Sequence, residues 1–441
     1  MSSLMRRCLT TCVGCVLLMP AASRANEPAG LTPSPAVTME PRKAAPDAAP
    51  LTLADCYALA LKRSETIAIN QELIKETEGR FLQALSGALP RVSFSSSDKR
   101  QDGSGGSAFT LRNVPERKFV FSQPLFSGFK EFAAMAGSRA ERRQRIEEKR
   151  RAEHLLLIDV ANAFYLLLEH REDLSALEAI RLALTQRLDE LKERERLGRS
   201  RASEVASAEA QLRRVEAEME GARSQEIVAR QLVEFLTGLD RIEAITDSEL
   251  SLPQLEDEAV YLAKTAGRPD VRAAEEASRI AEKEVTIAQA KFWPTVSADA
   301  NYYIKRAGVA QDVNWDATLQ VDVPIFQGGQ TLGAVKEASA RAREAKLQLS
   351  ERQRRAALEI QEVYTDMQAA LAKTSAFEKA LDASEESYRL QVEDYQRNLV
   401  STLDVLRELQ ALQDSRRDFI HATYDAKRLY WALRVATGET L

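Results

Sequence analysis

The chain contains the same strand-and-helix pattern twice, about 200 residues apart. The first copy carries PLFSG at 124–128, and the second carries PIFQG at 324–328. Each is preceded at a similar offset by another proline signal, LPRVS at 89–93 and WPTVS at 293–297. Matching positions continue downstream: Phe164 and Tyr364, Gly198 and Asn398, Glu204 and Asp404, Gly238 and Gly438. This duplication favours one architecture of two similar halves, 51–238 and 270–441 with a link at 239–269, over two or three unrelated domains.

Alternation of polar and apolar residues predicts two pairs of strands. We expect the first pair at about 90–98 and 117–125, and the second at about 294–305 and 315–324. In the second pair the polar residues share one face, because successive strand side chains point to opposite sides. These polar residues are Thr295, Ser297, Asp299, Asn301, Asp316, Thr318, Gln320 and Asp322. The first pair alternates less regularly.

Aromatic residues stand at both ends of the second strand pair. Trp293 and Phe326 mark one end, and Tyr302 and Trp315 mark the other. About ten tilted residues between such aromatic girdles span roughly 25 Å, the height of the apolar band of an outer-membrane strand. A soluble sheet also alternates, so it is the girdles that favour a membrane location.

The distribution of prolines predicts the helices. Proline is absent from 125–252 and 325–441, and both stretches are rich in the helix-favouring residues Ala, Glu, Arg, Gln and Leu. We expect four long helices, at about 129–197, 202–237, 330–397 and 402–437, and shorter ones at about 53–63, 65–88, 255–266 and 270–291. A helix of about 68 residues is about 100 Å long, far longer than a globular helix.

The first 25 residues have the form of a secretory signal peptide, with two arginines, an apolar run and a small-residue cleavage site. The CVGC segment at 12–15 lacks the usual leucine of a lipoprotein signal, so lipidation at Cys15 is not expected. Residues 26–50 are rich in proline and are expected to be a disordered or extended leader. Removal of the signal leaves Cys56 as the single thiol, which excludes an internal disulfide.

The composition gives no support for catalysis or nucleic-acid binding. The net charge is −5, and charge clusters along the helices are of mixed sign. His154, His170 and His421 have no neighbouring residues at metal-ligand spacing, so we expect them to be surface or packing residues and expect no metal or cofactor. The phosphate-binding GxxxxGK[ST] motif is absent, so the chain is not itself an ATPase, and we expect no enzyme activity.

The expected mature chain has no run of about 18 uncharged apolar residues, so a transmembrane helix is not expected. If the chain enters a membrane, only a closed β-barrel can satisfy its backbone hydrogen bonds there. Four strands cannot close, because the smallest barrels of this class use about eight. Several copies must therefore share one barrel, with the polar strand face lining a wet passage.

The duplication, the strand ends and the helix turns together resemble the TolC-like family of outer-membrane efflux proteins, over essentially all of 51–441. The opening LTLADCYALA at 51–60 is also similar to the start of that family. The resemblance implies a homotrimer with a shared twelve-stranded barrel and a long α-helical barrel in the periplasm. It also implies two partners, a periplasmic adaptor and an inner-membrane pump of the RND or ABC type.

The resemblance further implies a periplasmic entrance at the helix turn of the second half. Asp404, nine residues after Tyr395, matches the first of two positions that are often acidic in the family. The second position holds Arg407, which puts a purely acidic ring in doubt, because opposite charges one turn apart can pair. The two helix turns are candidate adaptor-docking points, at Gly198, Ser200, Asn398 and Val400.

The expected function is that of a passive exit duct in the outer membrane, extending into the periplasm. The alternative is a structural coiled-coil protein or adaptor of the periplasm without a channel, which would explain the helices but not the girdled strands. Within transport, small-molecule efflux and type I protein secretion both stay open, because a duct serves either.

Overall fold

The computed structural model describes residues 50–102, 111–247, 254–397 and 399–441. The expected signal peptide, Cys15, nearly all of the expected leader and Asn398 lie outside the described residues.

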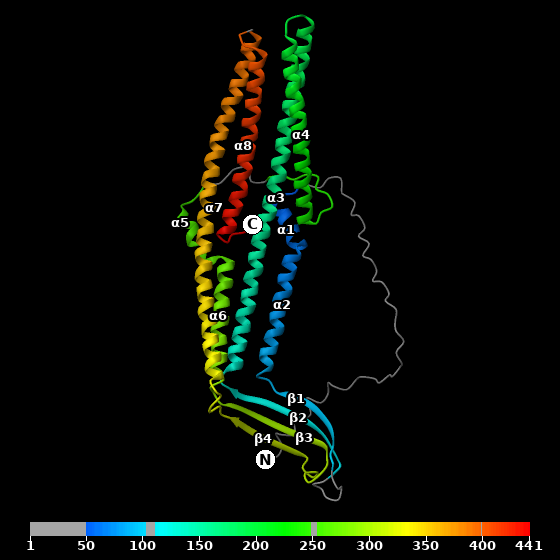
Figure 1. The fold of residues 1–441 in the computed structure, drawn as a ribbon, viewed down its shortest axis with the longest axis vertical. Coiled ribbons are helices and arrows are strands. Elements are labelled where there is room, and N and C mark those ends of the chain that lie inside the picture. The colour runs from blue at the N-terminus through cyan, green and yellow to red at the C-terminus, as the bar shows by residue number, and fades with distance from the viewer. Residues whose placement is uncertain (1–49, 103–110, 248–253, 398) are drawn as a thin grey trace, which may run out of the picture. The chain divides into compact units, whose positions relative to one another are not determined.

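Two helices of 67 residues dominate the described chain, α3 (Lys130–Arg196) and α7 (Gln330–Gln396). Each reverses at a short turn and continues as a second long helix, α4 (Ala202–Thr237) or α8 (Thr402–Ala436). A rise of ~1.5 Å per residue makes α3 and α7 each about 100 Å long. Figure 1 shows the strands at one end of these helices and the α3–α4 and α7–α8 turns at the other.

Shorter helices precede each strand pair. The first half has α1 (Leu53–Arg63) and α2 (Glu65–Ser86), and the second has α5 (Glu258–Ala263), a 3-10 turn (Thr265–Gly267) and α6 (Pro269–Ala290). The prediction of a single helix at about 255–266 is therefore wrong, because the segment is divided into α5 and the 3-10 turn. Its α-helical part starts at the Asp257 cap, whose carboxylate accepts from the Ala259 N–H, and ends before Lys264.

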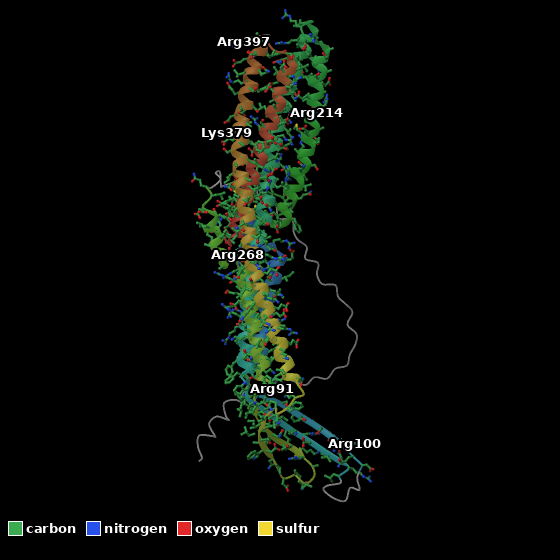
Figure 2. The ribbon with its side chains drawn as sticks, turned by 60° about the vertical axis from the view of Figure 1, so that its left-hand side comes forward. Arg91, Arg100, Arg214, Arg268, Lys379 and Arg397 are labelled. Carbon is green, nitrogen blue, oxygen red and sulfur yellow. The ribbon has the colours of Figure 1, made fainter. Side chains whose placement is uncertain are left out.

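The two strand pairs form one antiparallel sheet in the order β1-β2-β3-β4. The strands are β1 (Arg91–Arg100), β2 (Asn113–Ser127), β3 (Thr295–Arg306) and β4 (Trp315–Asp322). Pairing of β2 with β3 joins the two halves, and it leaves β1 and β4 as the two edges. In Figure 2, Arg91 and Arg100 mark the two ends of β1. The mainly α-helical fold with two strand pairs is confirmed.

The largest hydrophobic core gathers where α1, α4 and α8 pack on the middle of α3. Its largest members include Phe164, Tyr165 and Trp431, each at most 1% exposed, and Trp431 Nε1 donates to the Tyr165 hydroxyl at 3.2 Å. A second core lies between α3 and α4, towards their turn. There the heptad-like residues of α3 are all buried: Leu177, Ile180, Leu184, Leu188 and Leu191. Packing of this kind gives an α3–α4 coiled coil.

Arg268, which has no exposed surface, connects the start of α6 and the end of α8 to the middle of α7. The Arg268 guanidinium binds the carboxylate of Asp270 at 3.0 Å and that of Glu359 in α7 at 2.5 Å, and it donates to the Ala436 carbonyl at the end of α8 at 2.8 Å. These bonds satisfy a buried charge that would otherwise be costly. Arg268 thereby fixes the start of α6 against α7 and α8.

Among the described residues, none of the helices combines the length and the apolar character needed to cross a membrane.

Candidate functional site

The polar residues expected on one strand face do share a face. The register of β3 and β4 places each opposite a polar partner: Thr295 and Asp322, Ser297 and Gln320, Asp299 and Thr318, Asn301 and Asp316. Directly paired residues in a sheet project to the same side. The eight side chains therefore form one continuous polar surface.

A hydrogen-bonded network occupies this surface near the far end of the strands. Asp316 accepts from Asn301 Nδ2 and from the Tyr303 hydroxyl, both at 2.7 Å. The Arg306 guanidinium lies 4.2 Å from the centre of the Tyr303 ring, and Tyr303 is only 8% exposed. Tyr303 therefore belongs to the polar face. Alternation alone supports that position.

The opposite face of the sheet is apolar and open. Its cross-strand pairs are Val92 and Phe121, Phe94 and Phe119, Val296 and Val321, Ala300 and Ala317, Tyr302 and Trp315. Leu319 and Val321 are 66% and 58% exposed. Apolar side chains that stay this exposed along a whole sheet need a non-aqueous neighbour. The sheet therefore has one polar face and one exposed apolar face.

The four expected girdle residues lie near the two ends of the β3–β4 pair. Tyr302 pairs with Trp315 at the loop end. At the helix end, the Trp293 ring packs edge-on against Phe126 with centroids 6.4 Å apart. Phe326, the counterpart of Phe126 in the second half, is 88% exposed.

The helix turn of the first half is closed by glycine. Gly198 has φ of +68°, and the Gly198 and Arg199 N–H groups donate to the carbonyls of Glu195 and Arg194, both at 2.8 Å. This left-handed ending satisfies carbonyls that the last helical turn would leave unpaired. The Ser200 hydroxyl donates to Glu204 at 2.6 Å, which closes the start of α4.

At the end of α7, Tyr395 is held between the two halves of the chain. Arg194 of α3 donates from Nη1 to the Tyr395 hydroxyl at 2.9 Å, and Thr402 Oγ1 lies 3.3 Å from the same oxygen. The Arg187 guanidinium lies 3.7 Å from the ring centre. These contacts leave Tyr395 only 8% exposed. The two arginines were not singled out in the sequence, since nothing local links them to a residue about 200 positions away.

Asp404 forms hydrogen bonds at the start of its own helix, α8. Its Oδ2 accepts from the Ser401 N–H at 3.0 Å and from the Ser401 hydroxyl at 2.6 Å, which forms a capping box at the start of α8. The hydrogen bonds from the Ser401 side chain and backbone hold the pKa of Asp404 below its usual range, so this carboxylate stays charged. Arg407 Nη1 lies 3.6 Å from Asp404 Oδ1, and the Arg407 side chain is 80% exposed. The remaining turn residue Val400 is half-buried.

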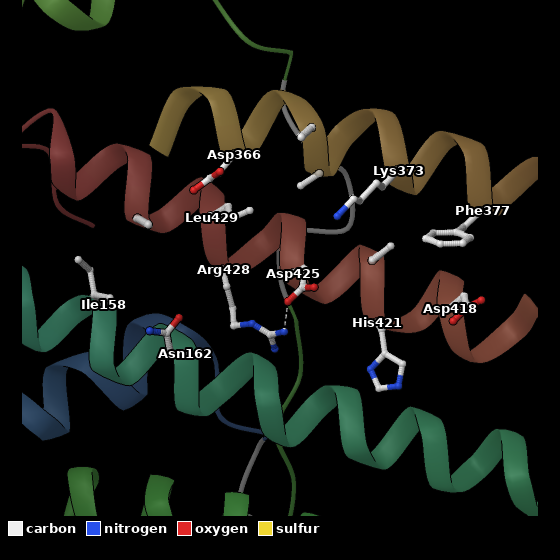
Figure 3. A pocket seen from close by; sticks show the side chains of 14 residues that line it. Ile158, Asn162, Asp366, Lys373, Phe377, Asp418, His421, Asp425, Arg428 and Leu429 are labelled. Carbon is white, nitrogen blue, oxygen red and sulfur yellow. Dashed lines mark hydrogen bonds and ion pairs between the residues drawn. The ribbon is translucent and has the colours of Figure 1, made fainter. Parts of the chain in front are cut away.

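A second polar cluster connects the halves farther from the turn. Glu169 of α3 is 5% exposed and binds both His421 and Arg428 of α8. Figure 3 shows His421, Asp425 and Arg428 on α8, lining a cavity between α3, α7 and α8. Hydrogen bonding to Glu169 raises the pKa of His421. Burial opposes the ionisation of Glu169, but its two cationic partners more than offset that and lower its pKa.

The prediction for His421 as a packing or surface residue did not include its pairing with Glu169. The two residues are 252 positions apart, so only the tertiary structure brings them together. No group of three or more His, Cys, Asp or Glu side chains suited to a metal ion occurs in the part of the chain that the structure describes.

A sheet with one polar and one exposed apolar face has the pattern of outer-membrane barrel strands, and in this chain it continues into helices of about 100 Å. Residues 262–439 match the family model described as outer membrane efflux protein. The chain is 24% identical to the alkaline protease secretion protein AprF of Pseudomonas aeruginosa over 420 residues, which covers 89% of this chain and 85% of AprF. It is 19% identical to the outer membrane protein TolC of Vibrio cholerae over 330 residues, which covers 72% of this chain and 75% of TolC.

The fold is also similar to solved structures. The outer membrane protein VceC of Vibrio cholerae matches with a TM-score of 0.77 at 24% identity, over 88% of this chain and 96% of VceC. The second half of the chain is thus similar to the outer membrane efflux protein family, and most of the chain is similar to AprF and TolC. TolC and VceC are both described as outer membrane proteins.

Proposed function

We propose that three copies of the chain form the passive exit duct of a tripartite export system. An inner-membrane pump and a periplasmic adaptor deliver the substrate, and the duct carries it across the periplasm and the outer membrane. The observation that carries this proposal is the four-stranded sheet with one polar face, one exposed apolar face and two open edges.

The polarity of each face of the sheet determines whether that face contacts lipid or water. The apolar face, with Leu319 more than half exposed, is stable against lipid and not against water. The polar face around Asn301 and Asp316 then lines the passage, and the aromatic girdles mark the membrane boundaries. Open strand edges have no partners in lipid, so the barrel must close. Three copies supply twelve strands, an even number within the range of known barrels.

The helical part continues the passage. Helices of about 100 Å reach through the periplasm, and their turns lie farthest from the sheet (Figure 1). Two contacts narrow the entrance there in our proposal: Tyr395 with Arg194, and Asp404 with Arg407. Because Arg407 pairs with Asp404, the entrance is less attractive to cations than an acidic ring would be.

The helix turns are the proposed docking points of the adaptor. Gly198 and Ser200 form the first turn, and Asn398 and Val400 belong to the second. The turns are exposed ends of long coiled coils, and an adaptor helix pair can pack on such ends. The pump is of the RND or ABC type.

The name of AprF refers to protease secretion, which supports a type I secretion role as one candidate. Small-molecule efflux is the other, since the family model is named for efflux. Deletion of the gene separates them. Dye or drug accumulation in the deletion strain supports efflux, whereas loss of one large secreted protein with unchanged accumulation supports secretion.

A structural coiled-coil protein or adaptor without a channel is the competing function. Such a protein would have equally long helices, but it would not need an apolar sheet face flanked by aromatic girdles. Membrane fractionation tests the choice. A duct stays with outer membranes through high-salt washing and runs as an oligomer that dissociates on heating. A freely soluble monomer would contradict the duct.

A further inference from the structure

The apolar face of the sheet ends near the strand loops in a row of aromatic side chains. Phe119 of β2 pairs with Phe94 on one side and with Tyr302 on the other, and Tyr302 also pairs with Trp315. These four residues, the aromatic row, are between 45% and 68% exposed. Exposed aromatic residues in such a row are typical of the level at which lipid chains meet their headgroups. The row therefore marks the end of the apolar band.

The next row along the same face is cationic. Arg117 precedes Phe119 by two positions, so its side chain lies on the same face, about 7 Å farther along the strand. Lys305 pairs directly with Arg117 and so projects to that side as well. Both residues are exposed. The face thus changes from aromatic rings to positive charge within one step of the pleat.

A β-bulge in β3 produces this pairing. Lys118 pairs with Tyr303. The next pair is Arg117 with Lys305, so Ile304 is the extra residue of the bulge. Strict alternation without the bulge would put Ile304 opposite Arg117 and would turn Lys305 to the polar face. The bulge therefore brings a second cation to the apolar side.

β1 adds a third cation to this side. Arg100, labelled in Figure 2, follows Phe94 by six positions in a regular strand and so shares its face. Asp98 is the carboxylate that the described strands place on this face beyond the aromatic row. Arg100, Arg117 and Lys305 form no ion pair with any described residue. The excess positive charge on this side is therefore not balanced within the described chain.

The polar face has the opposite arrangement at the same level. Lys118 follows Arg117 in the chain and projects to the polar face. Arg306 follows Lys305 and does the same. Both bind the carboxylate of Glu116, Lys118 Nζ at 2.9 Å and Arg306 Nε at 3.8 Å. The cations of the polar face therefore have a counter-charge within the chain, whereas those of the apolar face need one from outside.

We propose that Arg100, Arg117 and Lys305, the cationic row, bind the phosphate groups of lipids in the outer leaflet of the outer membrane. The acyl chains of these lipids then cover the apolar face, and the aromatic row lies between the chains and the headgroups. Guanidinium and ammonium groups bind phosphate by charge-assisted hydrogen bonds, and arginine can donate two parallel ones. The inference rests on the proposed membrane position of the sheet and adds the ligand that its loop end selects.

The surroundings of the cationic row favour a phosphorylated lipid over a free phosphate ion. A lipid supplies the anion and also covers the exposed aromatic row beside it, whereas a free ion leaves those rings in water. A zwitterionic headgroup carries its own ammonium group and offers little net charge. We therefore expect preference for a lipid with a net negative phosphate headgroup, for which lipid A is the probe.

Binding of lipid A to the purified full-length oligomer in detergent tests the proposal. The test variant carries Arg117→Gln and Lys305→Gln. The matched control carries Lys118→Gln and Arg306→Gln, which removes the same charge from adjacent positions on the polar face. Each cation near an anionic lipid surface contributes about fivefold in affinity. We expect the test variant to bind lipid A at least about tenfold more weakly, and the control to stay within about twofold of the unaltered protein.

Three results would overturn the lipid site. The first is equal affinity of the test variant and the unaltered protein. The second is an equal loss in the control, because overall charge and not the cationic row would then explain the binding. The third is displacement of lipid A by millimolar inorganic phosphate but not by sodium chloride of the same ionic strength, which would show a site for the free ion.

A charge-preserving variant and a conductance measurement complete the test. Arg117→Lys with Lys305→Arg exchanges the two side chains, and we expect it to bind lipid A within about threefold of the unaltered protein. A loss as large as that of the glutamine variant would contradict a charge-based site. The same samples are then recorded in bilayers without lipid A. A glutamine variant that conducts normally and binds lipid A as tightly as the unaltered protein would remove the lipid site and leave the proposed duct intact.

Discussion

Arg194 in the first half donates a hydrogen bond from Nη1 to the hydroxyl of Tyr395 in the second half, at 2.9 Å. The two residues lie next to their respective helix turns, 201 positions apart in the chain. Thr402 and Arg187 complete the contact, so the ends of the two helical hairpins are pinned together at one phenol. In a duct, the distance between these hairpins sets the width of the entrance.

Tyr395→Phe should open the entrance. It removes the hydrogen bond to the charged Arg194, which is worth about 1.5–3 kcal/mol, and so shifts the balance from closed to open by about tenfold or more. Single-channel recordings should show a larger mean conductance. Tyr388→Phe, in the same helix, is the control and should leave conductance unchanged. The same conductance for Tyr395→Phe and the unaltered channel would remove Tyr395 from the gate.

The charges at Asp404 and Arg407 should tune ion passage. Arg407→Glu replaces a pair of opposite charges with two acidic side chains one turn apart, so block by divalent cations should strengthen. Asp404→Ala should weaken that block, and it also removes the N3 member of the α8 capping box at a cost of about 1 kcal/mol.

Ser401→Ala separates these two effects, because it removes the cap hydroxyl and keeps the Asp404 charge. We expect its cation block to match that of the unaltered channel. If neither Asp404→Ala nor Arg407→Glu changes conductance or block, the entrance lies elsewhere.

Arg268→Leu should be the most destabilising single change considered. It leaves the carboxylates of Asp270 and Glu359 without their buried partner, and removal of one member of a buried ion pair costs about 3–5 kcal/mol. Denaturant unfolding monitored by circular dichroism measures the loss. The exposed Arg272, one turn later, is the control, and Arg272→Leu should change stability by less than about 0.5 kcal/mol. Equal stabilities for the two variants would show that the ion pairs of Arg268 are dispensable.

The pair of His421 and Glu169 should make the contact of α3 with α8 depend on pH. The folded pKa of His421 is raised, so its stabilising contribution is complete below the ordinary histidine pKa near 6.5 and is lost as pH rises through the folded value. The folded pKa of Glu169 is lowered, so its contribution is present above about 4.5 and is lost as pH falls below that.

Stability of the unaltered protein should therefore fall as the pH rises above about 6.5, by an amount that His421→Asn abolishes. Glu169→Gln should abolish the same slope, because the imidazolium then has no carboxylate to bind. Thermal unfolding at several pH values provides the measurement. Parallel pH profiles for the unaltered protein and both variants would exclude the pair as a source of pH dependence.

Helix positions follow closely from the sequence, because proline-free stretches rich in Ala, Glu, Arg and Leu have few alternatives to helix. The shared polar face follows equally well, since period-two alternation fixes sides regardless of neighbours. The contacts of Tyr395, Glu169 and Arg268 could not be predicted, because their partners come from the other half of the chain or from distant helices. The strand expected to reach about 324 ends at Asp322, since the length of β4 depends on what lies beside it, and local sequence does not encode that.

Reconstitution into planar lipid bilayers tests the central claim most directly. The purified oligomer should insert and produce discrete, long-lived conductance steps without added energy, as expected for a passive duct with a wet lumen. An oligomer that enters the membrane and gives no steps, in the presence or absence of the Tyr395→Phe change, would contradict the exit-duct function.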